Sequence, residues 1–228
     1  MKKRYAILFL AIINIAAVLT LAGDARAEKI LIYMDRAQND HLKAYGVVYK
    51  AVAKGIGAEW LLNYRNGSFL MDNADFVRET ANYMGVSFET IGDDAAASIY
   101  SIIKDNNMDA VKIEKSPKIA VYSPPDKRPW DDAVTLALTY AEIPYDTLWD
   151  SEVLKGDLKK YDWLHLHHED FTGQYGKFYG AYKNAVWYQK QVRLYEQNAR
   201  DAGFKSVQAH KCAVAKTIKK YVEEGGFL

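Results

Sequence analysis

The chain has 228 residues, a formal net charge of +1 and a single cysteine, Cys212. One cysteine excludes an intramolecular disulfide framework, and the balanced charge gives no indication of nucleic-acid binding. Half of the residues are hydrophobic, and a chain of this length can bury a substantial core in one domain or in two small ones.

The first 27 residues predict a secretory signal peptide. Basic residues at positions 2–4 precede an apolar run over residues 5–21, and Ala25 and Ala27 form an Ala-x-Ala cleavage site. We expect an exported protein, periplasmic or secreted, with no stable membrane anchor after cleavage. An uncleaved anchor is the alternative, because the apolar run nearly reaches the length that spans a bilayer. The segment carries four of the 30 basic residues and one of the 29 acidic residues, which leaves 26 against 28 in the mature chain.

Residues 28–115 are predicted to form an N-terminal α/β region. Short apolar strands are expected at residues 29–35, 58–64 and 86–91, and amphipathic helices at residues 40–55, 73–85 and 93–105. Strands that alternate with helices favour parallel βαβ units. The charged stretch around residue 115 marks the expected domain boundary.

The same alternation restarts in residues 116–228. Strands are expected at residues 116–126, 145–149 and 158–168, a helix at residues 130–143, and two further helices from about Ala185 onward. The sequence therefore predicts an α/β fold with a parallel sheet and flanking helices. The closing letters GGFL follow a helix and look like the first residues of a strand, so we expect that the last part of this domain is truncated.

Polar residues gather where the predicted strands end, which is where open parallel sheets bind their ligands. One group follows the first two strands, and a second lies in LHLHHEDFTGQYGKFY, residues 164–179, which holds three of the five histidines. A small polar ligand is the expected partner, with no cofactor and no metal. The candidate ligand-binding residues are Asp35, Arg65, His165, His167, His168, Glu169, Asp170 and Tyr175.

The clustered histidines allow three interpretations. Along a strand, His165, His167 and Glu169 share one face, a spacing that permits a zinc site. They can also be hydrogen-bonded anchors for the loop that follows, or direct contacts to a polar ligand. We prefer a site in which they position residues 169–179 over a ligand without binding metal. The closely spaced aromatic residues of this loop permit a lid or a sugar-stacking surface, or a packed surface loop.

Other residues carry weaker signals. Ser123 follows a strand, but no Gly-x-Ser-x-Gly surrounds it, and Cys212 lies opposite the apolar stripe of the last helix. Asp131 and Asp132 are expected to cap a helix rather than act as catalytic acids. Arg65 either holds a carboxylate through two hydrogen bonds or is an ordinary exposed turn residue.

Three long stretches resemble one group of proteins: MDRAQNDHLKAYGVVYKAVAKGIGAEWLLNYRNGSF, PWDDAVTLALTYAEIPYD and YDWLHLHHEDFTGQYGKFY. Together they are similar to exported bacterial proteins labelled "asparagine synthetase B", and the similarity covers the mature chain from Lys29 to Leu228. The resemblance implies a flavodoxin-type, class I glutamine amidotransferase-like domain. It also implies a continuation past GGFL into a strand and a cysteine-containing turn.

Two functions remain open at this point. The first is an amidotransferase-like or hydrolase-like enzyme, with any cysteine nucleophile beyond Leu228 and catalytic residues still unknown. The second is a non-catalytic periplasmic binding module for a sugar or another polar ligand. A metal-dependent hydrolase at His165 and His167 is a weaker third hypothesis.

Overall fold

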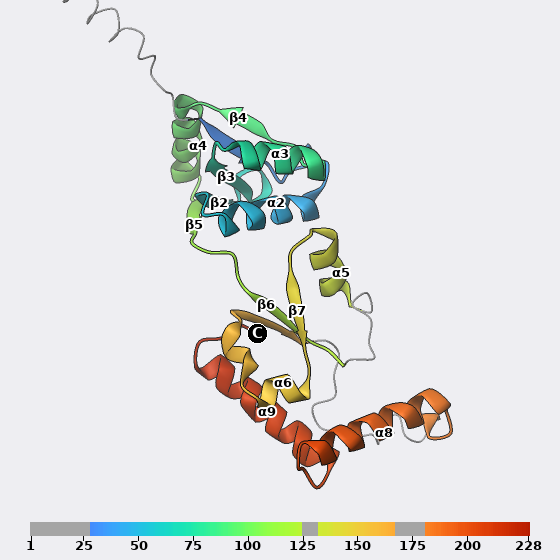
Figure 1. Ribbon diagram of the computed structural model, residues 1–228. Helices are drawn as coiled ribbons and strands as arrows, with labels where there is room; N and C mark the ends of the chain where they lie inside the picture. The colour runs from blue at the N-terminus through green and yellow to red at the C-terminus, as the bar shows by residue number, and fades with distance from the viewer. Residues whose placement is uncertain (1–27, 125–131, 167–180) are drawn as a thin grey trace, which may run out of the picture. The chain divides into compact units, whose positions relative to one another are not determined.

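The computed structural model describes residues 28–124, 132–166 and 181–228, which form two compact units (Figure 1). The first unit comprises the chain up to Asp40 together with Ile56–Ile113. The second comprises His41–Gly55 and Glu114–Leu228. The later boundary, after Ile113, is two residues before the expected one at residue 115. Helix α2 (His41–Ala53) differs from the expectation, because it belongs to the second unit despite its early place in the sequence.

The sheet of the first unit is antiparallel throughout, so the predicted parallel arrangement is wrong here. Its strands are β1 (Lys29–Ile32), β2 (Ala58–Leu62), β3 (Ser68–Asp72), β4 (Glu89–Ile91) and β5 (Asp109–Ile113), in the spatial order β4-β1-β3-β2-β5. All four neighbouring pairs run antiparallel.

A hairpin that the sequence analysis missed explains this difference. Strands β2 and β3 are joined by a single 3₁₀ turn, η1 (Tyr64–Asn66), and a connection this short permits only antiparallel pairing. Asn63, Arg65 and Asn66 all have positive φ, and Gly67 follows at φ +92°. Trp60 closes the turn because its indole N–H donates to the Gly67 carbonyl at 3.0 Å.

Two helices complete the first unit, α3 (Asp75–Met84) and α4 (Asp93–Asp105). Helix α4 packs Ile99 and Ile103 into one buried cluster with strand residues Leu31, Leu61 and Leu70. Helix α3 ends at Gly85, which is left-handed and donates its N–H to the carbonyls of Ala81 and Asn82.

The second unit holds a parallel sheet of three short strands, β6 (Ile119–Tyr122), β7 (Tyr145–Leu148) and β8 (Trp163–Leu166), in the order β7-β6-β8. Beyond β8, Phe227 makes an isolated parallel bridge to Trp163. Besides α2, the described helices of this unit are α5 (Ala133–Tyr140), α6 (Asp150–Leu154), α8 (Val186–Asp201) and α9 (Val207–Glu223), with the 3₁₀ turn η3 (Asp157–Lys160).

Helix α9 and helix α6 cover one face of this parallel sheet. Their buried side chains share a core with those of β6 and β8, and this core contains Ala120, Tyr122, Leu164, Val153, Val214 and Ile218. The fold is therefore α/β, but the predicted flavodoxin-like parallel sheet is wrong, because a five-stranded antiparallel sheet accompanies a parallel sheet of only three strands. Within the described ranges, no helix is both long enough and apolar enough to cross a membrane.

Candidate functional site

The carboxyl edge of the β7-β6-β8 sheet carries polar side chains on both of its faces. Val121 is in register with His165, and Tyr122 is in register with Leu166. Residues that pair in register point to the same face, and successive residues alternate. His165 and Tyr122 therefore belong to opposite faces of the sheet near the same edge, where parallel sheets bind ligands.

On the first face, His165 pairs with Asp132. The imidazole Nε2 of His165 lies 2.8 Å from the Asp132 carboxylate oxygen Oδ2. The His165 side chain is 20% exposed, whereas that of Asp132 is only 5% exposed. A buried carboxylate thus holds an imidazole that solvent can still reach.

Asp132 occupies this position because it caps helix α5. Its other carboxylate oxygen accepts a hydrogen bond from the Val134 amide at 2.6 Å, and its backbone carbonyl accepts one from the Thr135 hydroxyl. The predicted capping role of Asp132 is confirmed, while Asp131 lies outside the described residues. Burial by itself raises the pKa of Asp132, but the hydrogen bonds from His165 and Val134 outweigh burial and place that pKa below its usual value.

On the opposite face lies a buried ionic network. Lys211 on α9 donates hydrogen bonds from Nζ to the Tyr122 hydroxyl and to Asp150 Oδ1, both at 3.0 Å. Tyr122 also donates its hydroxyl proton to Asp150. These three residues are at most 2% exposed. The Lys211 ammonium additionally lies 3.7 Å from the ring centre of Trp149, which is a favourable cation–π position.

Among the residues that the structure describes, two buried polar atoms beside this network have no hydrogen-bond partner. They are the indole Nε1 of Trp149 and the imidazole Nε2 of His210. His210 is 2% exposed, directs Nδ1 toward Asp150 Oδ2 at 3.7 Å, and stacks on Phe204 with ring centres 5.0 Å apart. Burial, aided by the nearby Lys211 charge and opposed by Asp150, lowers the pKa of His210.

Asp35 and Arg65, both predicted site residues, come together in the first unit. The Arg65 guanidinium donates from Nε to Asp35 at 2.6 Å and from Nη1 to Glu89 at 3.2 Å, and it stacks 4.2 Å over the Tyr33 ring. The hydrogen bond to Asp35 is the main reason that the pKa of Arg65 is raised. Arg65 therefore binds two carboxylates, Asp35 and Glu89, and both belong to the first unit.

The other predicted site residues cannot be placed. His167, His168, Glu169, Asp170 and Tyr175 lie outside the described residues. Among the residues that the structure describes, no three His, Cys, Asp or Glu side chains are close enough to hold a metal ion. The zinc hypothesis included His167 and Glu169, so it stays a prediction.

The sequence analysis missed the buried network, although α9 contains a signal for it. Val207, Val214 and Ile218 define the apolar stripe of this helix, and Lys211 lies on that stripe, four residues after Val207 and three before Val214. A lysine on a buried helix face requires a buried partner. The signal in α9 therefore predicts an acidic partner, and the structure identifies it as Asp150.

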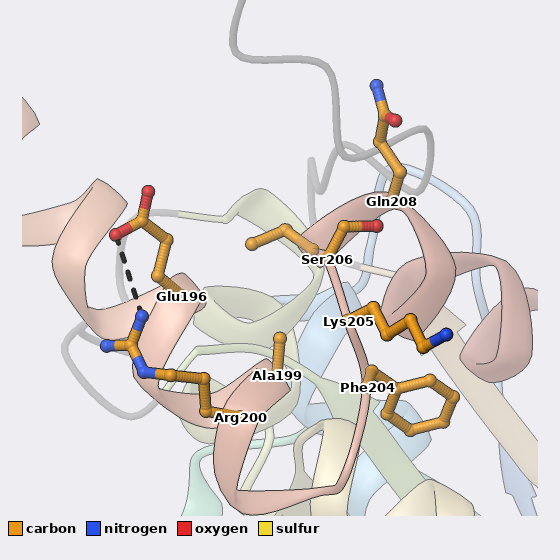
Figure 2. A pocket seen from close by; sticks show the side chains of 8 residues that line it. Glu196, Ala199, Arg200, Phe204, Lys205, Ser206 and Gln208 are labelled. Carbon is orange, nitrogen blue, oxygen red and sulfur yellow. Dashed lines mark ion pairs between the residues drawn. The ribbon is translucent and has the colours of Figure 1, made fainter.

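A hollow of about 430 Å³ lies at the junction of α8 and α9 (Figure 2). Ser206 caps α9 here by accepting a hydrogen bond from the Ala209 amide at 3.1 Å. Glu196 and Arg200 form an ion pair at 3.9 Å. The lining residues are Glu196, Ala199, Arg200, Phe204, Lys205, Ser206, Val207 and Gln208.

No protein-family profile, no curated protein and no solved structure matches this chain. The resemblance to proteins labelled "asparagine synthetase B" therefore remains a prediction.

Proposed function

We propose that this protein is an exported hydrolase-like enzyme that acts on a small polar substrate, with His165 as its acid–base residue. The 2.8 Å contact between His165 Nε2 and Asp132 Oδ2 carries the proposal. A carboxylate that accepts a hydrogen bond from one imidazole nitrogen fixes the tautomer and the orientation of the ring. The second nitrogen is then available to take a proton from a nucleophile or from water.

The charge state of Asp132 supports this role. Its pKa lies below the usual value, so the carboxylate is ionised at neutral pH and can only accept hydrogen bonds. The proton of a neutral His165 is then on Nε2, and Nδ1 carries the lone pair. The His165 side chain is one-fifth exposed. A small substrate can therefore reach the imidazole ring.

The location of the pair also supports the proposal. His165 lies one residue before the end of β8, and Asp132 begins α5, the helix that follows β6. Both are at the edge of the parallel sheet where catalytic residues collect in α/β proteins. We infer export from the signal-peptide pattern of residues 1–27.

Hydrolysis of two probes tests this function: 4-nitrophenyl acetate as an ester and L-glutamine as an amide, with release of nitrophenol or ammonia measured. We expect His165→Gln to lower kcat by about 10²–10⁴-fold, the usual contribution of a general base. Asp132→Asn keeps the helix cap but removes the charge, so it should lower kcat and alter its pH profile. Thr139→Val, on the same helix but bonded to Tyr145, is the matched control and should keep the wild-type rate. Equal rates for wild type and His165→Gln on both probes would contradict the proposal.

A specific observation favours a second candidate, a binding module for sugars. Tyr182 and Trp187 form an exposed aromatic pair with ring centres 5.2 Å apart, and Trp187 is 56% exposed. Exposed aromatic rings offer flat apolar faces with polar handles, which suit stacking against a sugar. Quenching of tryptophan fluorescence by a panel of monosaccharides, abolished by Trp187→Ala and accompanied by no hydrolysis of either probe, would favour this candidate over the enzyme.

A further inference from the structure

His210 is a buried titratable residue that the proposed reaction does not use. It lies in the first turn of α9 and faces Asp150, the first residue of α6. We propose that His210 is an acid-responsive residue, which holds the first turn of α9 against α6 only while its imidazole is neutral. The argument rests on the charges around Asp150 and on the surroundings of each imidazole nitrogen.

The Asp150 carboxylate already has a cationic partner. Lys211 contacts its Oδ1 at 3.0 Å, and both side chains are at most 3% exposed. Protonation of His210 would place a second cation 3.7 Å from the same carboxylate. Both cations would then contact the Asp150 carboxylate, and the contacts of His210 among the described residues include no further anion for the added charge. A buried charge without a partner of its own is strongly unfavourable.

The two imidazole nitrogens of His210 have different surroundings. Nδ1 faces the carboxylate at 3.7 Å, so the negative charge favours the neutral tautomer with its proton on that nitrogen. The additional proton then binds at Nε2, which is buried and has no hydrogen-bond partner among the described residues. Acid would thus convert an unused lone pair into an unsatisfied buried N–H as well as adding charge.

In the described part of the chain, the other groups around this cluster do not compensate for a charge on His210. Tyr122 from β6 and Tyr195 from α8 face the Lys211 ammonium, and phenols carry no charge at acid pH. Phe204 covers the imidazole ring and lines the hollow at the α8–α9 junction, where Arg200 and Lys205 outnumber Glu196 (Figure 2). The electrostatic surroundings beyond Phe204 are therefore basic.

The direction of the pH effect follows from these contacts. Burial lowers the pKa of His210 in the folded chain below 6.5, so the unfolded chain binds the proton first as the pH falls. The contribution of neutral His210 to the free energy of unfolding is then fully present above about pH 6.5. It decreases below that pH until the pH reaches the lowered pKa of the folded state. One proton changes the unfolding equilibrium constant by at most tenfold per pH unit.

Hydrogen exchange and thermal unfolding of the full chain between pH 5.0 and 7.5 test this inference. We expect wild-type amides at residues 207–214 to exchange faster, after correction for intrinsic rates, as the pH falls below 6.5. The His210→Gln variant stays neutral over this pH range. Its amide exchange rates and its unfolding temperature should therefore depend less on pH than those of wild type. His41→Gln replaces an exposed histidine at the start of α2 and should behave like wild type.

Direct titration of the His210 ring by NMR in the wild-type chain provides a second readout if the glutamine variant does not fold. A midpoint below 6.5 supports the inference. A midpoint at or above 6.5 overturns it, and so does a folded His210→Gln variant with the same pH dependence as wild type.

Discussion

The two units place their polar side chains differently because their strands run in different directions. In the antiparallel sheet of the first unit, the carboxyl ends of neighbouring strands lie at opposite edges. In the second unit, all three strands end at the same edge. The segments after β6 and β7 and the end of β8 therefore place Asp132, Asp150 and His165 near this one edge, whereas the first unit has no comparable edge among its described residues.

The ion pairs of the two units differ in burial as well as in position. Arg65 and Asp35 are each about 30% exposed, while Lys211 and Asp150 are at most 3% exposed. Solvent weakens the first pair and gives its members an alternative partner in water. The second pair has no such alternative, so its loss should be far more costly.

Lys211→Met should produce the largest loss of stability. The substitution keeps most of the side-chain volume but leaves Asp150 buried without its ammonium partner, which we expect to cost about 3–5 kcal/mol of unfolding free energy. Urea unfolding followed by tryptophan fluorescence measures this loss. The double variant Lys211→Met, Asp150→Asn should recover a part of it, because neither charge of this buried pair remains. If the unfolding free energy of Lys211→Met alone is within 1 kcal/mol of wild type, burial does not make the Lys211–Asp150 pair more important than the exposed Arg65–Asp35 pair.

Arg65→Ala should have a smaller effect, about 1 kcal/mol. The substitution removes partly exposed ion pairs to Asp35 and Glu89 and the stacking on Tyr33, each worth at most about 1 kcal/mol. Arg65→Gly should be less destabilising than Arg65→Ala by about 1 kcal/mol, because φ is +44° at this position. Urea unfolding gives both values, and a loss comparable to that of Lys211→Met would show that exposure is not the deciding factor.

The smallest effect should be the acid dependence that Asp132 contributes. A carboxyl whose pKa is lowered by folding stabilises the native state above its unfolded pKa of about 3.8, and the contribution disappears as the pH falls through the folded pKa. Asp132→Asn should therefore reduce the loss of stability between pH 5 and pH 3, as measured by urea unfolding at each pH. Identical pH profiles for the two proteins would refute an ionised Asp132.

The sequence analysis placed most helices but did not determine the sheet topology of the first half. Ser68 was read as the end of a turn and residues 69–72 were assigned to no element, although SFLMD forms the central strand β3. The apolar run is short, and its register depends on left-handed residues at 63, 65 and 66 that no apolar periodicity reveals. Once β3 was missed, β1 and β2 looked like neighbours joined by a helical crossover.

The candidate site was only partly predictable for a related reason. His165 was selected because two histidines on one strand face are unusual, and Asp132 was recognised only as a helix cap. Their contact joins residues 33 positions apart, a distance over which a single sequence carries no pairing information. Lys211 was detectable from its place on an apolar stripe, but its partners Tyr122 and Asp150 lie 89 and 61 positions away.

The short connection between β2 and β3 has a consequence for the order in which the chain folds. Only residues 63–67 separate these strands, so their pairing closes a small loop, and hairpins of this kind form within about 1–10 μs. Pairing of β6 with β8 must instead bring together residues more than 40 positions apart, and such non-local contacts form more slowly. We therefore expect the β2–β3 hairpin to form early and to provide the template onto which β1 and β5 add, while the parallel edge that holds His165 assembles later.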